Sequence, residues 1–170
     1  MNLVMTATPL AMEGCGFDFG PTSQVIQWHV VGMFLPSFFT GRLIERYGVL
    51  NIMMTGGVLM LGCIAVNLHG VTYPHFLVAL VLLGIGWNFL FIGGTTLLTE
   101  AYAPAEKAKT QGINDFIVST TVACTALSSG YLNFRFGWET LNEVAIPAVI
   151  ASLAASVWLT LRRRAAVRVA

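Results

Sequence analysis

The sequence predicts an all-α integral membrane protein, and three observations lead to that fold class. Only 10% of the 170 residues are charged, whereas soluble domains carry about 25%. Hydrophobic residues make up 56% of the chain, and its mean hydropathy is +0.75. The third observation is a series of apolar stretches long enough to cross a bilayer. Together they exclude a soluble globular domain, a disordered chain and a nucleic-acid-binding protein with a broad basic face.

Five stretches reach the ~20 mostly apolar residues that a helix needs to cross a hydrocarbon core. We expect one domain over residues 1–170, with spans at 22–44, 50–69, 74–98, 111–133 and 141–161. Pro74 suits a helix start, and Pro36 and Pro147 predict kinks whose freed carbonyls neighbouring helices must satisfy. The apolar residues 1–12 are too few to cross, so they predict a partial helix.

The basic residues predict the orientation of the spans. With five alternating spans, eight of the nine Lys and Arg residues fall on one side, and only Arg135 falls on the other. Basic residues accumulate on the cytoplasmic side of membrane proteins, so we expect a cytoplasmic C-terminus. The eight residues are Arg42, Arg46, Lys107, Lys109, Arg162, Arg163, Arg164 and Arg168.

The spans differ in polarity. Spans 50–69 and 141–161 are almost wholly aliphatic, which favours peripheral positions. The other three spans carry amide, imidazole, carboxylate and hydroxyl side chains. Polar groups are costly in hydrocarbon, so these three spans are expected to line a protein interior or a wet cavity.

In span 74–98, helical spacing places four residues on one face: Gly84, Asn88, Phe91 and Thr95. Gly86 and Gly93 form a second strip against which another helix can pack closely. Two hypotheses remain open for Asn88. Its carboxamide either faces a solute pathway or makes a hydrogen bond between helices.

In span 111–133, one face carries Asn114, Thr121, Thr125 and Ser128. Helix packing explains the hydroxyls, because Ser and Thr bond to carbonyls of their own helix. Asn114 and Thr121 are nevertheless candidates for a solute pathway. Two hypotheses remain open for Asp115. Its carboxylate either interacts favourably with the helix dipole near the start of the span or couples transport to a proton or cation.

In span 22–44, the candidates for a solute pathway are Gln24 and Gln27, which share a face with Trp28. His29 lies about 200° round the helix from Gln27, so the two side chains cannot easily line one cavity. As an imidazole that titrates near neutral pH, His29 is a coupling candidate, with a packed or interfacial histidine as the alternative.

Catalytic and metal-binding patterns are absent from the sequence. It contains no GxSxG, HExxH or P-loop motif, so we expect no enzyme activity and no cofactor. Cys15, Cys63 and Cys124 are far apart and include no CxxC pair, which argues against a disulfide framework or a metal site.

The loop GRLIERYG, from Gly41 to Gly48, resembles the cytoplasmic signature G-x-x-x-D-R-x-G-R-K/R of the major facilitator superfamily. Gly41, Arg46 and Gly48 match the signature, Glu45 stands in the acidic place, and the closing basic pair is missing. The later loop TEAYAPAEKAKTQG resembles the segment after the tenth helix of these transporters. The longer run GWNFLFIGGTTLLTEAYAPAEKAKTQGINDF resembles one group of bacterial permeases in that superfamily.

The resemblance implies that the five spans are helices eight to twelve and that residues 1–12 are the outer end of helix seven. It implies transport of a small solute by alternating access in a bacterial plasma membrane. It also implies a cytoplasmic charge network of Arg42, Arg46 and Glu100 that stabilises an outward-open state. Gly41, Glu45, Gly48 and Lys107 complete the implied cytoplasmic gate, although positive-inside topology with ordinary interfacial pairing is an alternative for the charges.

The resemblance covers the second half of such a transporter only. We therefore expect lipid and a small solute as partners, together with either a missing N-terminal half or a second copy, and no nucleic acid. The alternative function is that of a membrane interaction protein without transport activity, or an inactive transporter fragment.

Overall fold

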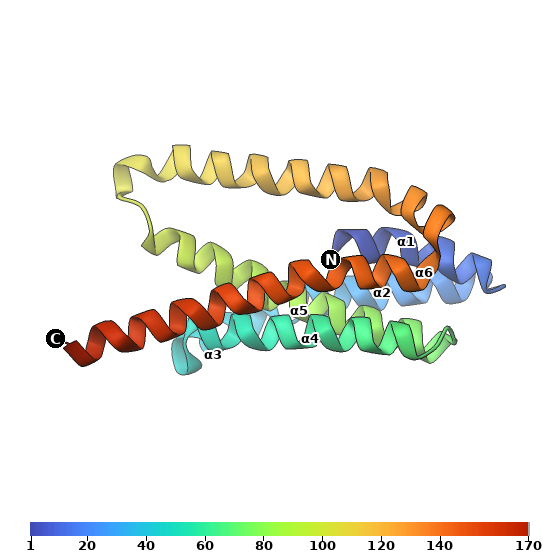
Figure 1. The fold of residues 1–170 in the computed structure, drawn as a ribbon, viewed down its shortest axis with the longest axis horizontal. Coiled ribbons are helices and arrows are strands. Elements are labelled where there is room, and N and C mark those ends of the chain that lie inside the picture. The colour runs from blue at the N-terminus through green and yellow to red at the C-terminus, as the bar shows by residue number, and fades with distance from the viewer. Residues whose placement is uncertain (170) are drawn as a thin grey trace.

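The computed structural model describes the backbone of residues 1–169 and the side chains of residues 1–165, so Arg168 lies outside the described side chains. Helices and no strands occur in residues 1–169, and this confirms the all-α fold class (Figure 1). The helices are α1 (Asn2–Gly14), α2 (Phe19–Phe34), α3 (Ser37–Tyr47), α4 (Val49–His69), α5 (Tyr73–Glu100), the 3-10 turn η1 (Pro104–Glu106) and α6 (Lys107–Val169).

The helix α6 is two helical arms joined at a reversal. Gly137 has φ 83° and ψ 172°, a conformation that side chains disfavour and glycine adopts readily. We call residues 107–136 the first arm and residues 138–169 the second arm. Figure 1 shows the first arm running away from the α5–α6 connection and the second arm returning beside α4. The predicted spans 111–133 and 141–161 lie one in each arm.

The predicted single span 22–44 is divided in the structure. The helix α2 ends at Phe34, and α3 begins at Ser37, with Leu35 and Pro36 between them. Pro36 has no N–H to continue the helical hydrogen bonds, and its ring clashes with the preceding turn. The proline therefore divides one predicted span into two helices.

Three helices of the structure are long and apolar enough to cross a membrane by length and composition. They are Val49–His69, Tyr73–Glu100 and the continuous stretch Pro104–Ala165, which contains the Gly137 reversal. The 16 residues of α2 alone are shorter than a span. The proline break and the reversal thus explain why this number differs from the five predicted stretches.

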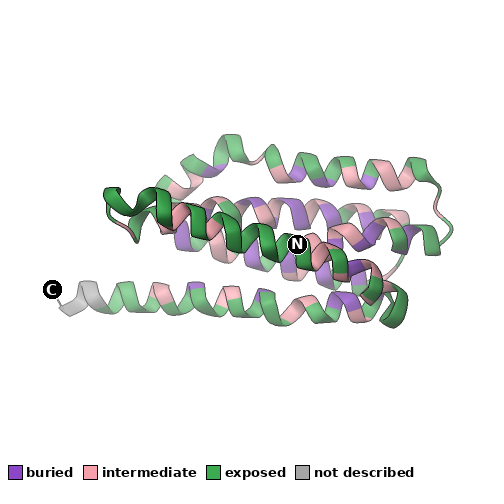
Figure 2. Ribbon diagram, turned by 90° about the horizontal axis from the view of Figure 1, so that it is seen from above, coloured by how far each residue is buried: buried purple, intermediate pink, exposed green. Residues whose placement is uncertain are grey.

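The helix α5 lies at the centre of the packing, with α2 on one side and α4 on the other. The helix α4 in turn contacts the second arm of α6, and α1 contacts α6 through Asn2, whose amide donates to the Val122 carbonyl at 3.0 Å. Figure 2 shows buried residues concentrated on the central helices, whereas the first arm is exposed along most of its length.

Close backbone approach between α4 and α5 depends on glycine. A Cβ added to Gly86 would lie 2.8 Å from the carbonyl oxygen of Gly56, and one added to Gly56 would lie equally close to the Gly86 carbonyl. Gly93 packs against Met53 of the same helix α4. The predicted Gly86/Gly93 packing strip is therefore confirmed, with α4 as its partner.

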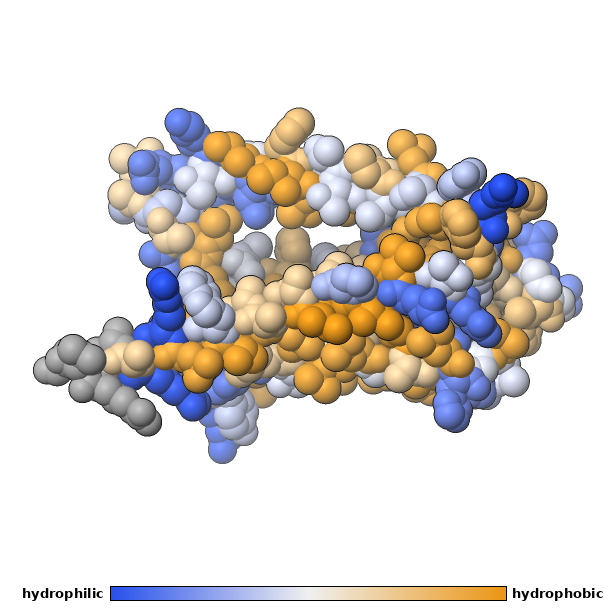
Figure 3. Space-filling model, in the orientation of Figure 1, coloured by the Kyte–Doolittle hydropathy of each residue, from blue (hydrophilic) through white to orange (hydrophobic). Residues whose placement is uncertain are grey.

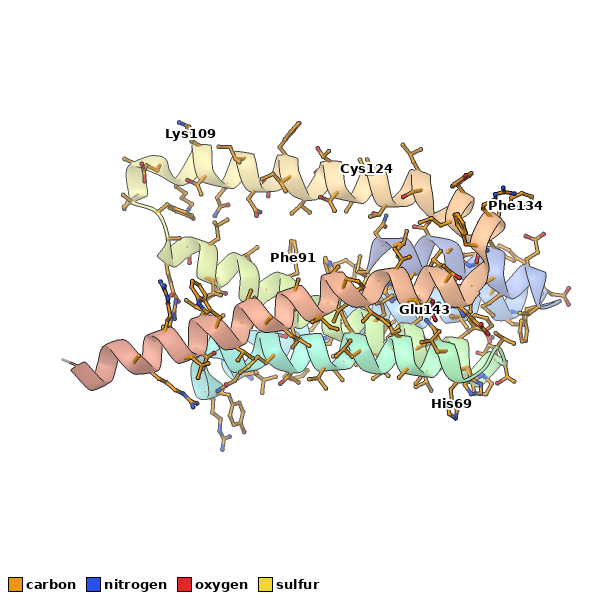
Figure 4. All side chains as sticks on the ribbon, in the orientation of Figure 1. His69, Phe91, Lys109, Cys124, Phe134 and Glu143 are labelled. Atoms are coloured by element: carbon orange, nitrogen blue, oxygen red, sulfur yellow. The ribbon has the colours of Figure 1, made fainter. Side chains whose placement is uncertain are left out.

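The charged residues separate toward the two ends of the bundle. We call the end that holds α3, the α5–α6 connection and the end of the second arm the basic end. Figure 4 shows Lys109 at this end, and His69 and Phe134 at the opposite end. In the space-filling view of Figure 3, hydrophilic residues gather at both ends and apolar residues cover the middle.

We predict that replacing Gly86 with Val destabilises the protein by about 1–3 kcal/mol, because the added side chain must push α4 away from α5. Unfolding in mixed micelles by titration with a denaturing detergent measures the loss. Gly94→Val is the matched control, because a Cβ at Gly94 meets no described atom within 4 Å. Equal losses of stability in the two variants would contradict the proposed importance of the close contact.

Candidate functional site

The proline break in α2–α3 is held by one carboxamide from α5. Asn88 Nδ2 donates to the Met33 carbonyl at 2.7 Å and to Ser37 Oγ at 2.6 Å. Thr40 Oγ1 donates to Asn88 Oδ1 at 2.7 Å and lies 2.8 Å from the Pro36 carbonyl. We call Asn88, Ser37 and Thr40, with the Met33 carbonyl, the Asn88 clamp.

The Asn88 clamp supplies hydrogen bonds where the helix cannot. Asn88 is 1% exposed and Thr40 is fully buried, so water cannot form hydrogen bonds with these groups. Unsatisfied backbone groups are costly in a membrane interior, and neighbouring helices must bond to carbonyls freed at a proline. Of the two hypotheses for Asn88, the structure shows the hydrogen bonds between helices.

The glycine pair beneath the clamp brings α2 and α5 together. A Cβ added to Gly32 would lie 3.1 Å from the carbonyl oxygen of Val81, and one added to Gly84 would lie 3.0 Å from the carbonyl carbon of Gly32. This close crossing leaves room for only short side chains. The short reach of an asparagine therefore suffices to bridge from α5 to the α2–α3 break.

His29 lies on the face of α2 that packs against α5. It is fully buried, and its Nδ1 lies 2.8 Å from the Leu80 carbonyl oxygen. A carbonyl oxygen only accepts, so Nδ1 carries the hydrogen, and Nε2 has no hydrogen-bond partner among the described atoms. The packed position agrees with the alternative that the sequence left open for His29, and its coupling role stays a prediction.

Gln24 and Gln27 both lie on exposed faces of α2, away from His29. Gln24 Oε1 accepts from the Tyr73 hydroxyl at 3.1 Å, and Gln27 Nε2 lies 3.4 Å from Ser23 Oγ. Gln27 also lines a mainly apolar hollow of about 560 Å³ with residues of α1 and α2. The structure does not bring these two amides to the other pathway candidates.

A polar pocket at the basic end gathers two of the predicted pathway residues and one coupling candidate. Thr95 from α5 meets Asn114 and Asp115 from the first arm around a volume of about 250 Å³. Asn114 Nδ2 lies 3.4 Å from Asp115 Oδ1. We call this the polar pocket, and its remaining lining residues are Thr96, Leu98, Thr99 and Gln111.

The position of Asp115 weakens one of its two explanations. The helix α6 begins at Lys107, eight residues before Asp115, which is about 12 Å along the axis. The helix dipole acts within the first turn, so it gives little stabilisation at this depth.

Thr121 lies further along the arm, is exposed, and donates to its own helix at the Ile117 carbonyl.

The signature loop forms α3 and the turn into α4. Gly48 ends α3 with φ 85°, a conformation that favours glycine, and its N–H donates to the Ile44 carbonyl at 2.8 Å. Nothing in the structure explains Gly41, where a Cβ meets no described atom within 4 Å. Arg42, Glu45 and Arg46 are exposed, and the Arg46 guanidinium lies 5.3 Å from the centre of the Tyr47 ring.

The charge pairing at the basic end differs from the network that the resemblance implies. Glu100 Oε2 lies 2.7 Å from Arg163 Nη2, and this is the ion pair that occurs among the described side chains. It joins the end of α5 to the second arm. Within the described residues, Arg42 and Arg46 make no ion pair with Glu100, and Lys107 is exposed at the start of α6.

Sequence reasoning missed an aromatic stack. The rings of Trp87 and Phe91 lie on α5 with their centroids 4.7 Å apart and their planes 16° apart. Their spacing of four residues on one helix face is the signal that points to such a pair. Figure 4 shows the Phe91 ring rising from α5 into the space below the first arm.

A second missed contact joins α4 to the second arm. Asn67 Nδ2 donates to Asn142 Oδ1 at 2.8 Å, and both residues are buried. Asn142 Nδ2 donates in turn to the Trp138 carbonyl.

Among the described residues, no three His, Cys, Asp or Glu side chains lie close enough to hold a metal ion.

Comparison with known proteins gives one family for the whole chain. The family described as Major Facilitator Superfamily matches residues 1–170. The riboflavin transporter RfnT of Brucella anthropi is 48% identical over 149 residues, which cover 88% of this chain and 37% of the relative. Two uncharacterized MFS-type transporters of Bacillus subtilis, YdeG and YddS, are 35% and 32% identical over 89% and 88% of the chain.

The chain spans little more than a third of the length of these relatives, between 36% and 37%. No solved structure matches it.

We predict that Asn88→Ala lowers the free energy of unfolding by about 1–2 kcal/mol, because it leaves the Met33 carbonyl and Ser37 Oγ without their donor. The measurement is unfolding in mixed micelles. Asn114→Ala serves as the control, since Asn114 bonds only weakly to its neighbour Asp115. A loss for Asn88→Ala no larger than that for Asn114→Ala would refute a stabilising role for the clamp.

Proposed function

This chain belongs to the major facilitator superfamily, and from that premise we propose that it is part of a permease that carries riboflavin or a closely related flavin across a bacterial plasma membrane. The family and the transporter relatives support a transport function. The identity of the solute rests on one observation, the 48% identity to a riboflavin transporter over 88% of the chain.

The proposed mechanism is alternating access, in which two halves of a transporter rock about a central site. We assign the predicted spans to helices eight to twelve and α1 to the outer end of helix seven. The other half of the machine is an N-terminal bundle, with a second copy of this chain as the alternative partner. The exposed apolar side chains of α2, including Trp28 and Phe34, supply a surface for such a partner or for lipid.

The basic end is proposed to face the cytoplasm. Arg42 and Arg46 lie in α3, Lys107 and Lys109 at the start of α6, and Arg162–Arg164 near the end of the second arm, whereas Arg135, Glu139 and Glu143 lie close to the Gly137 reversal at the opposite end. Basic residues in short loops set the orientation of a membrane protein. With this orientation the Glu100–Arg163 pair lies at the cytoplasmic ends of α5 and the second arm.

The Glu100–Arg163 pair is proposed to act in the cytoplasmic gate. Both side chains are about half exposed, so the pair adds little to the stability of the fold. An ion pair that is easily broken suits a contact that must open in each transport cycle. Arg42, Glu45 and Arg46 are proposed to meet the missing half in the same layer, with Gly41 and Gly48 flanking them.

The solute pathway is proposed to pass between α5 and the first arm. Thr95, Asn114 and Asp115 already meet there at the polar pocket, and Thr121 lies further along the same arm. Asp115 is the better coupling candidate because its carboxylate is exposed in this pocket, whereas His29 is buried against α5. Gln24 and Gln27 are proposed to contact the solute only where the missing half closes over α2.

The test is a chimera in which this chain replaces the matching segment of the Brucella anthropi transporter. A riboflavin auxotroph that expresses the chimera should grow at riboflavin concentrations too low for the parent strain. The auxotroph with the same transporter lacking that segment is the control. Absence of uptake from a chimera that reaches the membrane would contradict the proposed solute and favour an interaction protein without transport activity.

The orientation has a separate test in the same chimera. A fluorescent protein fused to the C-terminus should fluoresce, because it folds in the cytoplasm, and alkaline phosphatase at the same place should be inactive. Fusions after Gly70, at the opposite end, should give the reverse pattern. The opposite result at both positions would overturn the assignment of the basic end to the cytoplasm.

A further inference from the structure

The stacked pair on α5 differs from the other exposed aromatic residues of the chain. Trp87 and Phe91 lie one helical turn apart with nearly parallel rings, and 43% of Phe91 is exposed. The pair therefore offers an open aromatic face supported from behind by a second ring. Phe116, by comparison, lies on the first arm at 71% exposure and stacks on no other described ring.

The open face of the pair is directed toward the inside of the molecule. Figure 4 shows Phe91 pointing into the space between α5 and the first arm, and Figure 3 shows that the surface is hollowed there. An aromatic side chain that only contacts lipid has no reason to point into this hollow. The position suits a ligand that enters between the two helices.

The polar pocket lies next to the stack along α5. Thr95, a pocket residue, follows Phe91 by one turn, and its hydroxyl already bonds to the Phe91 carbonyl at 2.9 Å. Across the pocket are Asn114 and Asp115 of the first arm. An apolar wall with a few converging polar groups is the usual make-up of a small-molecule site.

We propose that the planar ring of the transported solute stacks on Phe91, and that its hydroxylated chain occupies the polar pocket. The inference rests on the proposed function, because riboflavin joins a flat conjugated ring to a polyhydroxylated chain. The open π-face of Phe91 matches the ring, since aromatic rings favour offset stacking at the spacing already seen between Trp87 and Phe91. The pocket volume of about 250 Å³ accommodates a short polyol.

The experiment measures riboflavin uptake and riboflavin fluorescence in the chimera described above. We expect Phe91→Leu to raise the KM for uptake about tenfold, because leucine keeps the bulk but removes the stacking surface. Phe91→Trp keeps a stacking surface and should restore the KM. Phe116→Leu is the matched control and should leave it unchanged.

Fluorescence gives a readout that a purely structural role would not move. Riboflavin bound to the purified Phe91→Trp chimera should lose fluorescence relative to the parent chimera, because a stacked indole quenches an excited flavin by electron transfer and a phenyl ring does not. Phe116→Trp should leave the fluorescence of the bound flavin unchanged. Lumichrome, which has the ring without the chain, should compete with riboflavin in the parent and lose affinity in Phe91→Leu.

The outcomes separate the two proposals. Uptake by the parent chimera, with an unchanged KM in Phe91→Leu and unchanged flavin fluorescence in Phe91→Trp, overturns the stacking site and leaves the riboflavin assignment standing. A parent chimera that neither binds nor carries riboflavin overturns both proposals.

Discussion

The structure depends on satisfying backbone hydrogen bonds in a chain that has few polar side chains to spare. Pro36 interrupts the predicted span 22–44, and the Asn88 clamp supplies hydrogen bonds at that interruption. Without hydrogen bonds to the backbone carbonyls freed at Pro36, nothing would fix the angle between α2 and α3 inside a membrane. One carboxamide thereby ties the helix that carries the signature loop to the central helix α5.

The sequence predicted the class of protein and most helices because hydrophobic length is a local property. It predicted the α4 and α5 boundaries closely, and the Gly86/Gly93 strip found its partner in α4. The break in span 22–44 required knowing whether Pro36 kinks or ends a helix, which depends on the neighbouring helix. The reversal at Gly137 likewise depends on a positive φ. The sequence has seventeen glycines and does not indicate which of them adopts that conformation.

Site residues were harder to predict, because helical periodicity gives a face but not the neighbour of that face. Asn88 and Thr95 share a face of α5, yet one is held against α2 and the other opens on the polar pocket. Glu100 was paired with arginines of the signature loop by resemblance, whereas the structure pairs it with Arg163 of the second arm. Both differences come from how far apart helices lie, which the sequence does not state.

Different residues of α5 serve packing, hydrogen bonding and the proposed contact with solute. Its glycines hold α2 and α4 close, Asn88 bonds to the α2–α3 break, and Phe91 and Thr95 are the residues that we propose contact the solute. The most direct test is a double-mutant cycle for unfolding with Asn88→Ala and Thr40→Val. The clamp predicts a coupling energy of about 0.5–1.5 kcal/mol between the two sites. Strictly additive losses would contradict it.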